Sequence, residues 1–504
     1  MSGRRANVVP TRCRAETRFF CVRQLTSVDA QFLALESPVR YGHVGSLMLL
    51  DPSTAPGGEL SLEAFQGLIA DRLAAVPPLR WRLAEVPLGL DYGYWFDDPD
   101  FDLDFHVREL ALPVPGTDAM LAEQVARIVA RPLDRARPLW EIYLLHGVRG
   151  DRVAVLTKIH HALIDGLSGA EILGALLDLT PEVRQVGSDP ATLSADRVPG
   201  QAEMIARGLL GLAHYPLRLA RSLPRALPYL GEVRSLGAVP GVVPGVRTLA
   251  KLASLCGDRV GFGGLEAPHT PFSRPLSAHR RFGFGSLPLG EVKAVKNAHN
   301  ATVNDVVVSL CAGAVRRWLV AHDALPDDPL VAQIPISVRT PEQAGSYGNQ
   351  IMLMTAPLFT TVPDPVKRLR ATHDALAEMK EVQTGMPARL LADANHFVPP
   401  ALLSRAARLS FALSSRRIGR PMWNLVVSNV PGPQFPLYLA GAKVTATFPV
   451  SVITDGMGLN ITVMSYCGSL DFGIVADRDQ VPDVDTLVGY LGAELDALTR
   501  TVPA

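Results

Sequence analysis

The sequence contains few cysteines, and they form no recognisable framework. Only five occur in 504 residues, an odd number at scattered positions: Cys13, Cys21, Cys256, Cys311 and Cys467. This spacing fits neither a set of disulfides nor a cysteine zinc site, and it favours a reducing compartment. We therefore expect a cytoplasmic protein without structural disulfides.

Long apolar runs are also lacking. No window of about eighteen consecutive residues is both apolar and free of charge, as a membrane-spanning helix requires. The first two dozen residues contain several arginines but no apolar segment of the length that a secretory signal needs. We expect neither a transmembrane span nor secretion, so any association with the inner face of a membrane should be peripheral.

An excess of charge of either sign is absent as well. Lys and Arg together number 49, as do Asp and Glu, so the formal net charge is zero. A protein without an overall positive field does not collect polyanions, and we expect no nucleic-acid partner. The hydrophobic fraction of 48% fits either a large core or apolar surface that meets lipid.

The length and pattern of the chain predict two halves joined by a connector. A chain of 504 residues is about twice the size at which a single hydrophobic core stops growing. Residues 1–21 have no periodicity and are expected to form a disordered extension. Residues 22–180 and 276–500 each mix strand and helix patterns, whereas residues 181–275 contain Gly, Pro, Arg and Leu in short amphipathic pieces. We predict an α/β (α+β) fold of two similar domains, a helical connector, and an active site between the domains.

Several strands and helices are predicted from local patterns. Apolar, β-branched runs predict strands over residues 44–50 and 152–159, and Ser61 is expected to begin a helix that ends near residue 75. Thr302 and Asp305 have the spacing of a capping box at the start of a helix that ends near residue 322. Further strands are predicted over residues 280–284, 331–336, 350–358, 424–428, 459–466 and 470–476, the last two forming a hairpin across Cys467 and Gly468.

Two adjacent histidines follow the strand predicted over residues 152–159. After His160 and His161 the chain turns through Asp165 and Gly166, and a helix is expected to about residue 177. A neutral imidazole, with a pKa of about 6.5, can take a proton from a hydroxyl near neutral pH. Because neighbours on a strand point to opposite faces, one histidine is expected to catalyse and the other to pack or orient. Asp165 would be stabilised at a helix N-terminus and would orient the loop.

Metal and cofactor chemistry are not indicated by this pattern. Adjacent histidines on opposite faces are poor co-ligands, and no glutamate follows as in a zinc protease. Asn304, in the first turn of the helix that Thr302 begins, is explained by capping or by a role as oxyanion donor or tunnel-lining group. Trp140 is expected to be a core aromatic residue. An amphipathic piece over residues 205–223 is either an ordinary surface helix or a helix at a membrane interface, and lipid substrates favour the second interpretation.

The arrangement of His160, His161, Asp165 and Gly166 resembles the His-His-x-x-x-Asp-Gly signature of coenzyme A-dependent acyltransferases. From residue 25 to about 498 the chain resembles the bacterial wax ester synthase/diacylglycerol acyltransferase family. Each shared element is weak by itself, but their order together is specific. They are Leu25 to Phe32, Glu36, His43 to Gly45, Pro138 to Trp140, Asn304 and Asp305, Ile334 to Arg339, Gly348 and Asn349, Ser428 to Pro433, and Gly458 to Asn460.

This resemblance implies a fold and roles for the motif residues. It implies two chloramphenicol acetyltransferase-like domains that face each other across a tunnel holding the active site. His161, the second histidine, would be the general base, and His160 would support it. Asp165 would be mainly structural, and Asn304 would serve as an oxyanion or tunnel group. Acyl-CoA would be a co-substrate, with no cofactor and no metal.

The reaction implied is direct transfer of a long-chain acyl group from acyl-CoA to diacylglycerol, giving triacylglycerol. Long-chain alcohols are a second class of acceptor, giving wax esters. The motif carries no Gly-x-Ser-x-Gly elbow, so a covalent acyl-enzyme is not indicated. The alternatives are a carrier-bound donor, as in condensation domains, a different hydroxyl acceptor, and a non-catalytic protein that binds lipid or coats lipid droplets. The surface of a membrane or a lipid inclusion would be the site of action.

Overall fold

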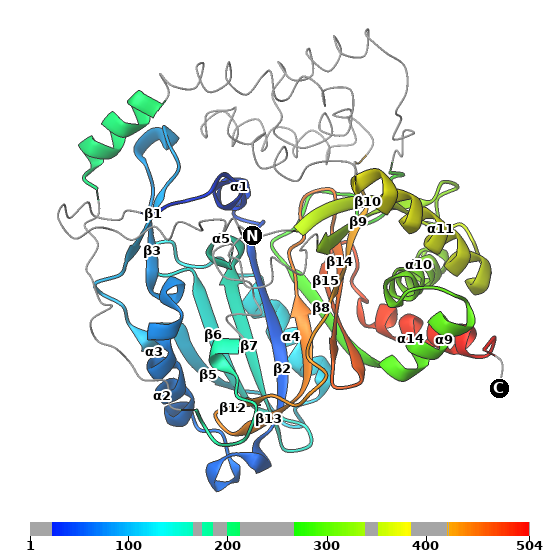
Figure 1. Ribbon diagram of the computed structural model, residues 1–504, viewed down its shortest axis with the longest axis horizontal. Coiled ribbons are helices and arrows are strands. Elements are labelled where there is room, and N and C mark those ends of the chain that lie inside the picture. Colours follow the sequence, from blue (N-terminus) through cyan, green and yellow to red (C-terminus); the bar gives the residue numbers. More distant parts are fainter. Residues whose placement is uncertain are drawn as a thin grey trace, which may run out of the picture.

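The computed structural model places two mixed α/β halves side by side (Figure 1). The predicted extension over residues 1–21 and most of the predicted connector lie outside the described residues, as do Asp165 and Gly166. The structure describes residues 23–164, 174–184, 199–211, 267–337, 351–384, 421 and 423–502.

The first half is built on a six-stranded sheet whose middle strands are buried on both faces. On β7 alternate residues enter two different apolar clusters, Val153 and Val155 on one face and Ala154 and Leu156 on the other. This alternation is that of a strand covered on both sides. In spatial order the strands are β12 (Tyr438–Leu439), β13 (Ala442–Val450), β2 (His43–Asp51), β7 (Arg152–His160), β6 (Trp140–Val148) and β5 (Val107–Ala111).

Smaller elements complete the first half. A three-stranded sheet contains β1 (Arg23–Gln24), β4 (Tyr94–Asp97) and β3 (Trp81–Ala84). The predicted helix after Ser61 is confirmed: the Ser61 hydroxyl accepts from the Ala64 N–H, and a 3₁₀ turn over Leu73–Ala75 extends the helix. The helices are α1 (Ser27–Leu35), α2 (Leu62–Arg72), α3 (Leu103–His106), α4 (Asp118–Val129) and α5 (His161–Ile164), and residues 201–211 form another.

The second half contains another six-stranded sheet. The predicted hairpin is confirmed, and its turn at Cys467 and Gly468 has positive φ angles of 43° and 85°. The order is β10 (Ile351–Leu358), β9 (Leu330–Ser337), β11 (Leu425–Val430), β14 (Leu459–Tyr466), β15 (Ser469–Asp477) and β8 (Arg280–Pro288).

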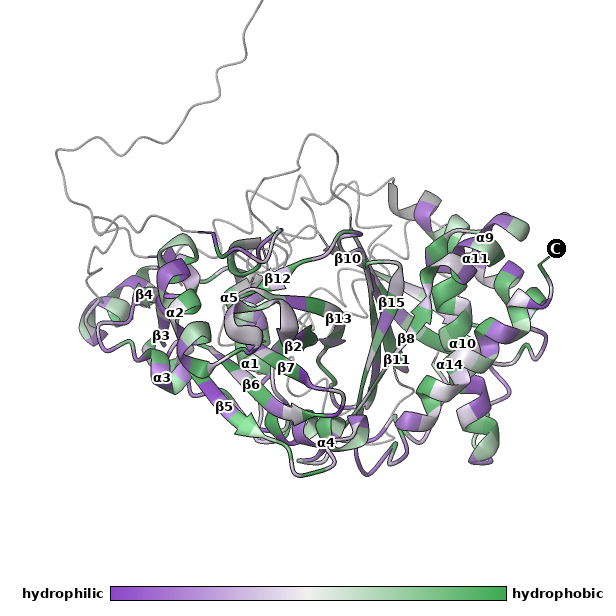
Figure 2. Cartoon of the chain, turned by 90° about the horizontal axis from the view of Figure 1, so that it is seen from below, coloured by the Kyte–Doolittle hydropathy of each residue, from purple (hydrophilic) through white to green (hydrophobic). Residues whose placement is uncertain are grey.

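A layer of helices covers the face of the second sheet that lies away from the first half (Figure 2). The predicted capping box is confirmed: the Thr302 hydroxyl accepts from the Asp305 N–H at 3.1 Å, and the Asp305 carboxylate accepts from the Thr302 N–H at 2.8 Å. Such reciprocal bonds satisfy two amides that the first turn of a helix leaves open. The layer consists of α9 (Leu289–Ala298), α10 (Val303–Ala321), α11 (Pro365–Thr384) and α14 (Asp485–Thr499).

The two sheets are joined by a strand that crosses from one half to the other. The chain leaves the second sheet after β11, forms β12 and β13 on the edge of the first sheet, and returns as β14. The predicted boundary at residue 276 therefore does not separate the sheets, because two strands of the later segment pair in the first. α4 fills the space between the first sheet and β8, where Val125 and Phe282 belong to one apolar cluster.

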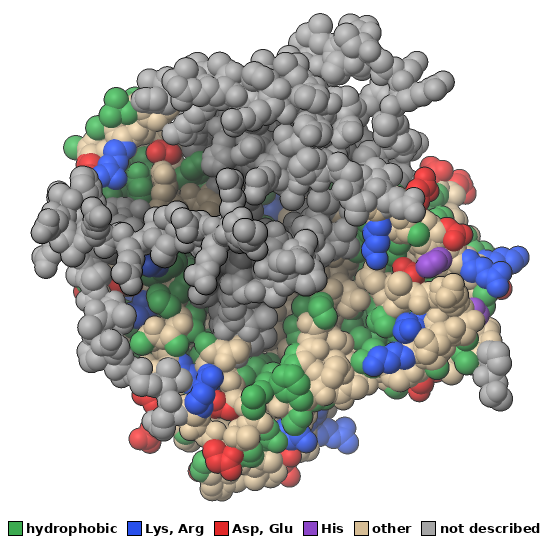
Figure 3. All heavy atoms as spheres, in the orientation of Figure 1, with side chains coloured by type: hydrophobic (Ala, Val, Ile, Leu, Met, Phe, Trp, Pro, Cys, Tyr) green, Lys and Arg blue, Asp and Glu red, His purple; other side chains and the backbone are tan. Residues whose placement is uncertain are grey.

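Charged side chains are mixed on the surface. On the described part of the face in Figure 3, basic and acidic groups lie among apolar and polar ones. This matches the balanced composition of 49 basic and 49 acidic residues.

Gly473 lies where the two sheets approach each other closely, and it gives a test of the crossing strand. A Cβ at this position would lie 1.8 Å from the Pro449 carbonyl oxygen on β13. We expect Gly473→Ala to separate β13 from β15 and to destabilise the fold by about 1–3 kcal/mol, as overpacked cores do. Thermal unfolding should show a Tm lowered by several degrees.

The matched control is Gly489→Ala on α14. Its Cβ would meet nothing within 4 Å, and alanine in an open helical position is neutral or stabilising. If Gly473→Ala melts at the same temperature as Gly489→Ala, the close packing of the two sheets described here is wrong.

Candidate active site

The two adjacent histidines lie where β7 passes directly into α5. The backbone N–H of His160 donates to the Leu139 carbonyl at 2.9 Å, and the backbone N–H of His161 donates to the Gly42 carbonyl at 2.8 Å. The backbone of the pair is thus held from both sides of the strand. The predicted change from strand to helix at this point is confirmed.

The ring of His160 is buried, and both of its nitrogens are engaged. Nδ1 accepts from the Ala162 N–H at 3.1 Å, and Nε2 lies 3.1 Å from Oε1 of Glu36. Because Nδ1 is an acceptor, the proton of the neutral ring is on Nε2 and is donated to the carboxylate. Because both ring nitrogens are hydrogen-bonded and only 1% of the residue's surface is exposed, this ring cannot take a proton from a substrate.

Glu36 is the anchor for this ring. Its carboxylate also accepts from the Gly42 N–H at 2.8 Å and from Nη2 of Arg135 at 2.8 Å. Burial by itself would raise the pKa of Glu36, but the hydrogen bonds from His160, Gly42 and Arg135 together lower it to about 2. The carboxylate is therefore ionised throughout the neutral range.

Gly42 is required by the space that His160 occupies. A Cβ on Gly42 would lie 2.7 Å from Nε2 of His160, closer than carbon and nitrogen pack in folded proteins. The same residue donates its N–H to Glu36 and its carbonyl accepts from the His161 N–H. Gly42 thus connects both histidines to the loop that precedes β2.

His161 has a different environment. Its ring is only partly buried and stacks on Phe32 of α1, with ring centroids 3.9 Å apart and an angle of 12° between the planes. Figure 2 shows α1 and α5 next to each other. Stacking on a fixed aromatic ring sets the plane of the imidazole, so His161 is oriented while part of its surface stays accessible.

Charged groups lie buried on the same sheet face as His160. Lys158 and Glu141 form an ion pair at 3.3 Å, and the Tyr143 hydroxyl donates to the same carboxylate at 2.8 Å. His43, directly opposite His160 on β2, donates through Nε2 to the Val129 carbonyl at 2.8 Å. Burial, and then the charge of Lys158, lower the pKa of His43 to about 3. His43 is therefore a neutral structural histidine.

Sequence reasoning did not find this buried set. Lys158, Glu141 and Tyr143 sit in apolar strand patterns, and Glu36 was singled out only as a family element. The sequence feature that could have indicated this set is the presence of polar residues inside β-branched runs, because an inward-facing charge in a buried strand requires a partner.

The structure places the other predicted residues as follows. Nδ2 of Asn429 donates to Oδ1 of Asn304 at 3.4 Å, and Asp305 accepts from Nδ1 of His373 at 2.8 Å besides capping α10. Trp140 is fully buried, and its indole N–H donates to the Leu79 carbonyl at 2.6 Å, which confirms a core position. The catalytic role of Asn304 stays a prediction.

Comparison with family models identifies the chain. Residues 25–307 match the wax ester synthase/diacylglycerol acyltransferase catalytic domain. Residues 347–499 match the C-terminal domain of the same enzymes. The chain belongs to the wax ester synthase/diacylglycerol acyltransferase family. The resemblance stated from the motifs is thereby confirmed.

Curated relatives and a solved structure of the family agree with this. A putative diacylglycerol O-acyltransferase of Mycobacterium tuberculosis strain CDC 1551 is 36% identical over 464 residues, covering 92% of this chain and 87% of that protein. A probable diacylglycerol O-acyltransferase of strain H37Rv, tgs2, is 34% identical over 478 residues, covering 94% and 98%. The wax ester synthase/diacylglycerol acyltransferase from Marinobacter aquaeolei VT8 superposes with a TM-score of 0.66 at 27% identity, covering 95% and 99%.

A more distant match concerns the fold alone. The first condensation domain of the CDA synthetase superposes with a TM-score of 0.51 at 15% identity and covers 96% of this chain and 97% of that one. Together with the family structure, this confirms the predicted class of two chloramphenicol acetyltransferase-like domains. The predicted tunnel between them stays a prediction.

The described residues show neither a metal-binding cluster nor a membrane-spanning helix. Within the described ranges no cluster of three or more His, Cys, Asp or Glu side chains is arranged to hold a metal ion. No helix in the described part of the chain has both the length and the apolar composition of a membrane span.

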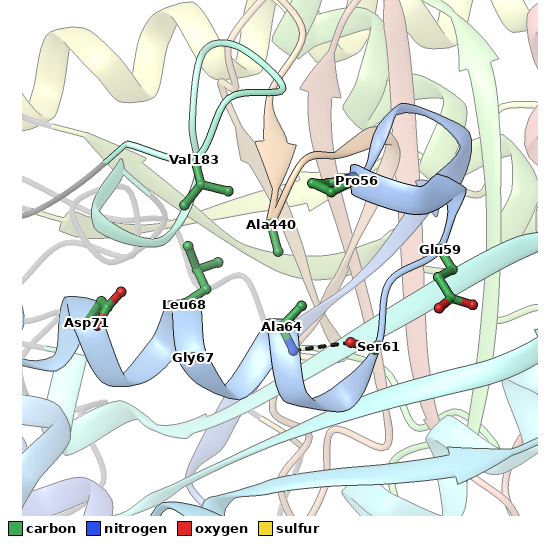
Figure 4. Close-up of a pocket in the computed structure, with 9 residues that line it drawn as sticks. All are labelled: Pro56, Glu59, Ser61, Ala64, Gly67, Leu68, Asp71, Val183 and Ala440. Carbon is green, nitrogen blue, oxygen red and sulfur yellow. Dashed lines mark hydrogen bonds between the residues drawn. The ribbon is translucent and has the colours of Figure 1, made fainter.

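A surface cleft of about 300 Å³ lies away from the histidine pair (Figure 4). It is formed by α2, the 3₁₀ turn η2 (Pro56–Gly58) and neighbouring loops, with Leu68 and Ala440 at its base and Glu59 and Asp71 on its rim. It contains none of the motif residues, and we assign it no part in the chemistry.

Two buried groups of the site predict a loss of stability in acid. The unfolded chain protonates His43 below pH 6.5, whereas the folded protein resists until about pH 3. Above pH 6.5 the contribution of His43 to stability is complete. Below pH 6.5 the equilibrium constant for folding falls about tenfold for each pH unit. Glu36 adds a second loss between pH 4.5 and 2, because protonation breaks its bonds to His160 and Arg135.

Thermal unfolding between pH 7.5 and 5 isolates the contribution of His43. The Tm of the wild type should fall over this range, and the Tm of His43→Gln, which keeps an N–H donor but cannot titrate, should fall less. Parallel curves for the two proteins would show that His43 is not buried in its neutral form.

Proposed function

We propose that this protein is an O-acyltransferase that moves a long-chain acyl group from acyl-CoA to the hydroxyl of diacylglycerol, giving triacylglycerol. Long-chain alcohols are a second acceptor class, giving wax esters. Membership of the family and the names of the mycobacterial relatives support this reading. The Marinobacter enzyme, similar over nearly the whole chain, supports the second acceptor class.

The proposal rests on the different environments of the two histidine rings. The nitrogens of His160 are used by Glu36 and Ala162 inside the protein, so this ring cannot be the base. His161 is partly exposed and held in one plane by Phe32. Direct acyl transfer needs one neutral imidazole that can reach a hydroxyl, and the partial exposure of His161 supports its assignment to this role.

His161 accepts the hydroxyl proton of the acceptor while the oxygen bonds to the thioester carbonyl carbon. The resulting tetrahedral oxyanion collapses, the carbon–sulfur bond breaks, and the coenzyme A thiolate takes the proton from the imidazolium. No proton is gained or lost over the cycle, and no cofactor is used. Asn304 is proposed as a donor to the oxyanion or as a tunnel group, and Asp165 as the residue that orients the motif loop.

The first test is release of free coenzyme A thiol from palmitoyl-CoA with diolein or hexadecanol as acceptor. His161→Ala should reduce acceptor-dependent release by about a hundredfold or more, because the base is lost while binding is kept. The exposed His279 provides the matched control, and His279→Ala should keep wild-type rates.

Either of two results would contradict the proposal. Wild-type protein that releases no more thiol with either acceptor than without one is not this transferase. A His161→Ala variant with full activity would exclude His161 as the base and favour the alternative of a lipid-binding protein.

We also propose peripheral association with a membrane or lipid inclusion, where diacylglycerol resides. The helix over residues 201–211 exposes 55% of Leu209 and 64% of Leu210. Gly208 of this helix packs against Leu90, and Leu88, two residues earlier in the chain, is 81% exposed. Exposed leucines supply area for insertion at a lipid interface. The remainder of the predicted interface helix, to residue 223, lies outside the described residues.

Flotation with diolein-containing vesicles tests this surface. Leu209→Ser combined with Leu210→Ser should lower the bound fraction several-fold, because apolar area available to the lipid is removed. Val114→Ser, at a 95% exposed position in the turn between β5 and α4, should bind like the wild type. Equal binding of both variants would exclude the helix as the contact.

A further inference from the structure

The loop over residues 36–42, between α1 and β2, contacts both the histidine pair and the second half of the chain. On one side Glu36 and Gly42 bind His160 and His161. Arg135 holds the Glu36 carboxylate from outside and also donates to the Leu33 carbonyl at 2.7 Å. The end of α1 and the start of the loop are thereby fixed together.

On its other side the loop is held by residues of the second half. Arg40 is buried, and its Nη1 donates to Oδ2 of Asp455 at 2.7 Å. The other oxygen of Asp455 accepts from the Leu276 N–H at 2.9 Å. Arg280 of β8 donates to the Val39 carbonyl. A seven-residue loop thus joins the motif to the segment between β13 and β14.

We propose that Glu36 is a positioning residue for the base His161, and that Asp455 sets the position of its loop. This rests on the proposed function. Glu36 holds the His160 ring, the ring holds the Ala162 N–H in the first turn of α5, and that turn carries His161. Without the carboxylate, a buried N–H of His160 loses its acceptor, which costs enough to favour another ring orientation. Release of the Ala162 N–H would then let the base move.

Displacement of a catalytic group by about 1 Å can cost about a hundredfold in rate without weakening substrate binding. We therefore expect Glu36→Ala to lower kcat by about tenfold to a hundredfold, with KM for palmitoyl-CoA changed less than about twofold. Glu36→Gln should recover part of the loss, since an amide oxygen can still accept from His160 and Gly42.

Two control variants separate positioning from general destabilisation. Glu85 is exposed and binds the same Arg135 at 2.6 Å, so Glu85→Ala removes a comparable ion pair without touching His160 and should keep kcat. Glu494 is buried among the helices of the second half, where it pairs with the buried Arg368 and the exposed Arg317. Glu494→Gln should lower the Tm while keeping kcat. If Glu36→Ala loses no more kcat than Glu494→Gln, or raises KM instead, the positioning role is wrong.

The contribution of Asp455 is tested by a double-mutant cycle. If both residues act through one loop, Asp455→Ala should lower kcat in the same direction as Glu36→Ala. The double variant should then lose less than the product of the two single losses. Strictly multiplicative losses would show that Asp455 does not act through Glu36.

A measurement independent of turnover distinguishes failure of this inference from failure of the proposed function. In histidine-¹⁵N-labelled protein, the His160 ring, assigned by its loss in His160→Gln, should show one tautomer with the proton on Nε2. Glu36→Ala should give a mixture or rapid proton exchange. An unchanged His160 signal in Glu36→Ala overturns the inference. A wild type with the expected signal but no acceptor-dependent thiol release overturns only the proposed function.

Discussion

The hydrogen bond between the imidazole of His160 and the carboxylate of Glu36 is the constraint on which the candidate site depends. It joins the end of β7 to the loop before β2 and removes one histidine of the pair from chemistry. The carboxylate stays ionised in a largely buried place because several donors converge on it. His161, the neighbour of His160, is the first residue of α5 and keeps part of its surface accessible.

The arrangement around His160 also depends on β13, which crosses from the second half and pairs in the first sheet. β13 pairs with β2, the strand that begins at His43, and it also approaches β15 at Gly473. The segment after β13 contains Asp455, which holds Arg40 in the loop before β2. A change in the relative position of the halves would thus reach the histidine pair through a short path of hydrogen bonds.

Buried ion pairs also occur elsewhere in the first half. Lys158 pairs with Glu141 on the sheet face that His160 shares, and Arg72 binds Asp178 at 2.6 Å and the Leu176 carbonyl at 2.7 Å. Removing such pairs from water offsets most of their attraction, so they add little net stability. Their effect is on arrangement, because a buried charge separated from its partner costs several kcal/mol. Arg72 in this way ties the segment that follows the motif to α2.

Local patterns and ordered motifs were sufficient to predict the short-range elements and the family. Alternation identified β7, residue spacing identified the capping box of α10, and the ordered motifs identified the family. The strand and the capping box depend on residues a few positions apart, whose side chains meet in any copy of the same strand or helix turn.

Contacts between residues far apart in the chain could be seen only in the folded protein. The strand pattern alone did not distinguish His160 from His161. In the fold the ring of His160 is engaged by Glu36, 124 positions away in the sequence. The transfer of β13 to the first sheet and the contact of Asn304 with Asn429 were likewise absent from local patterns. Periodicity records which face of an element is buried, whereas the partner across that face is set by how the whole chain packs.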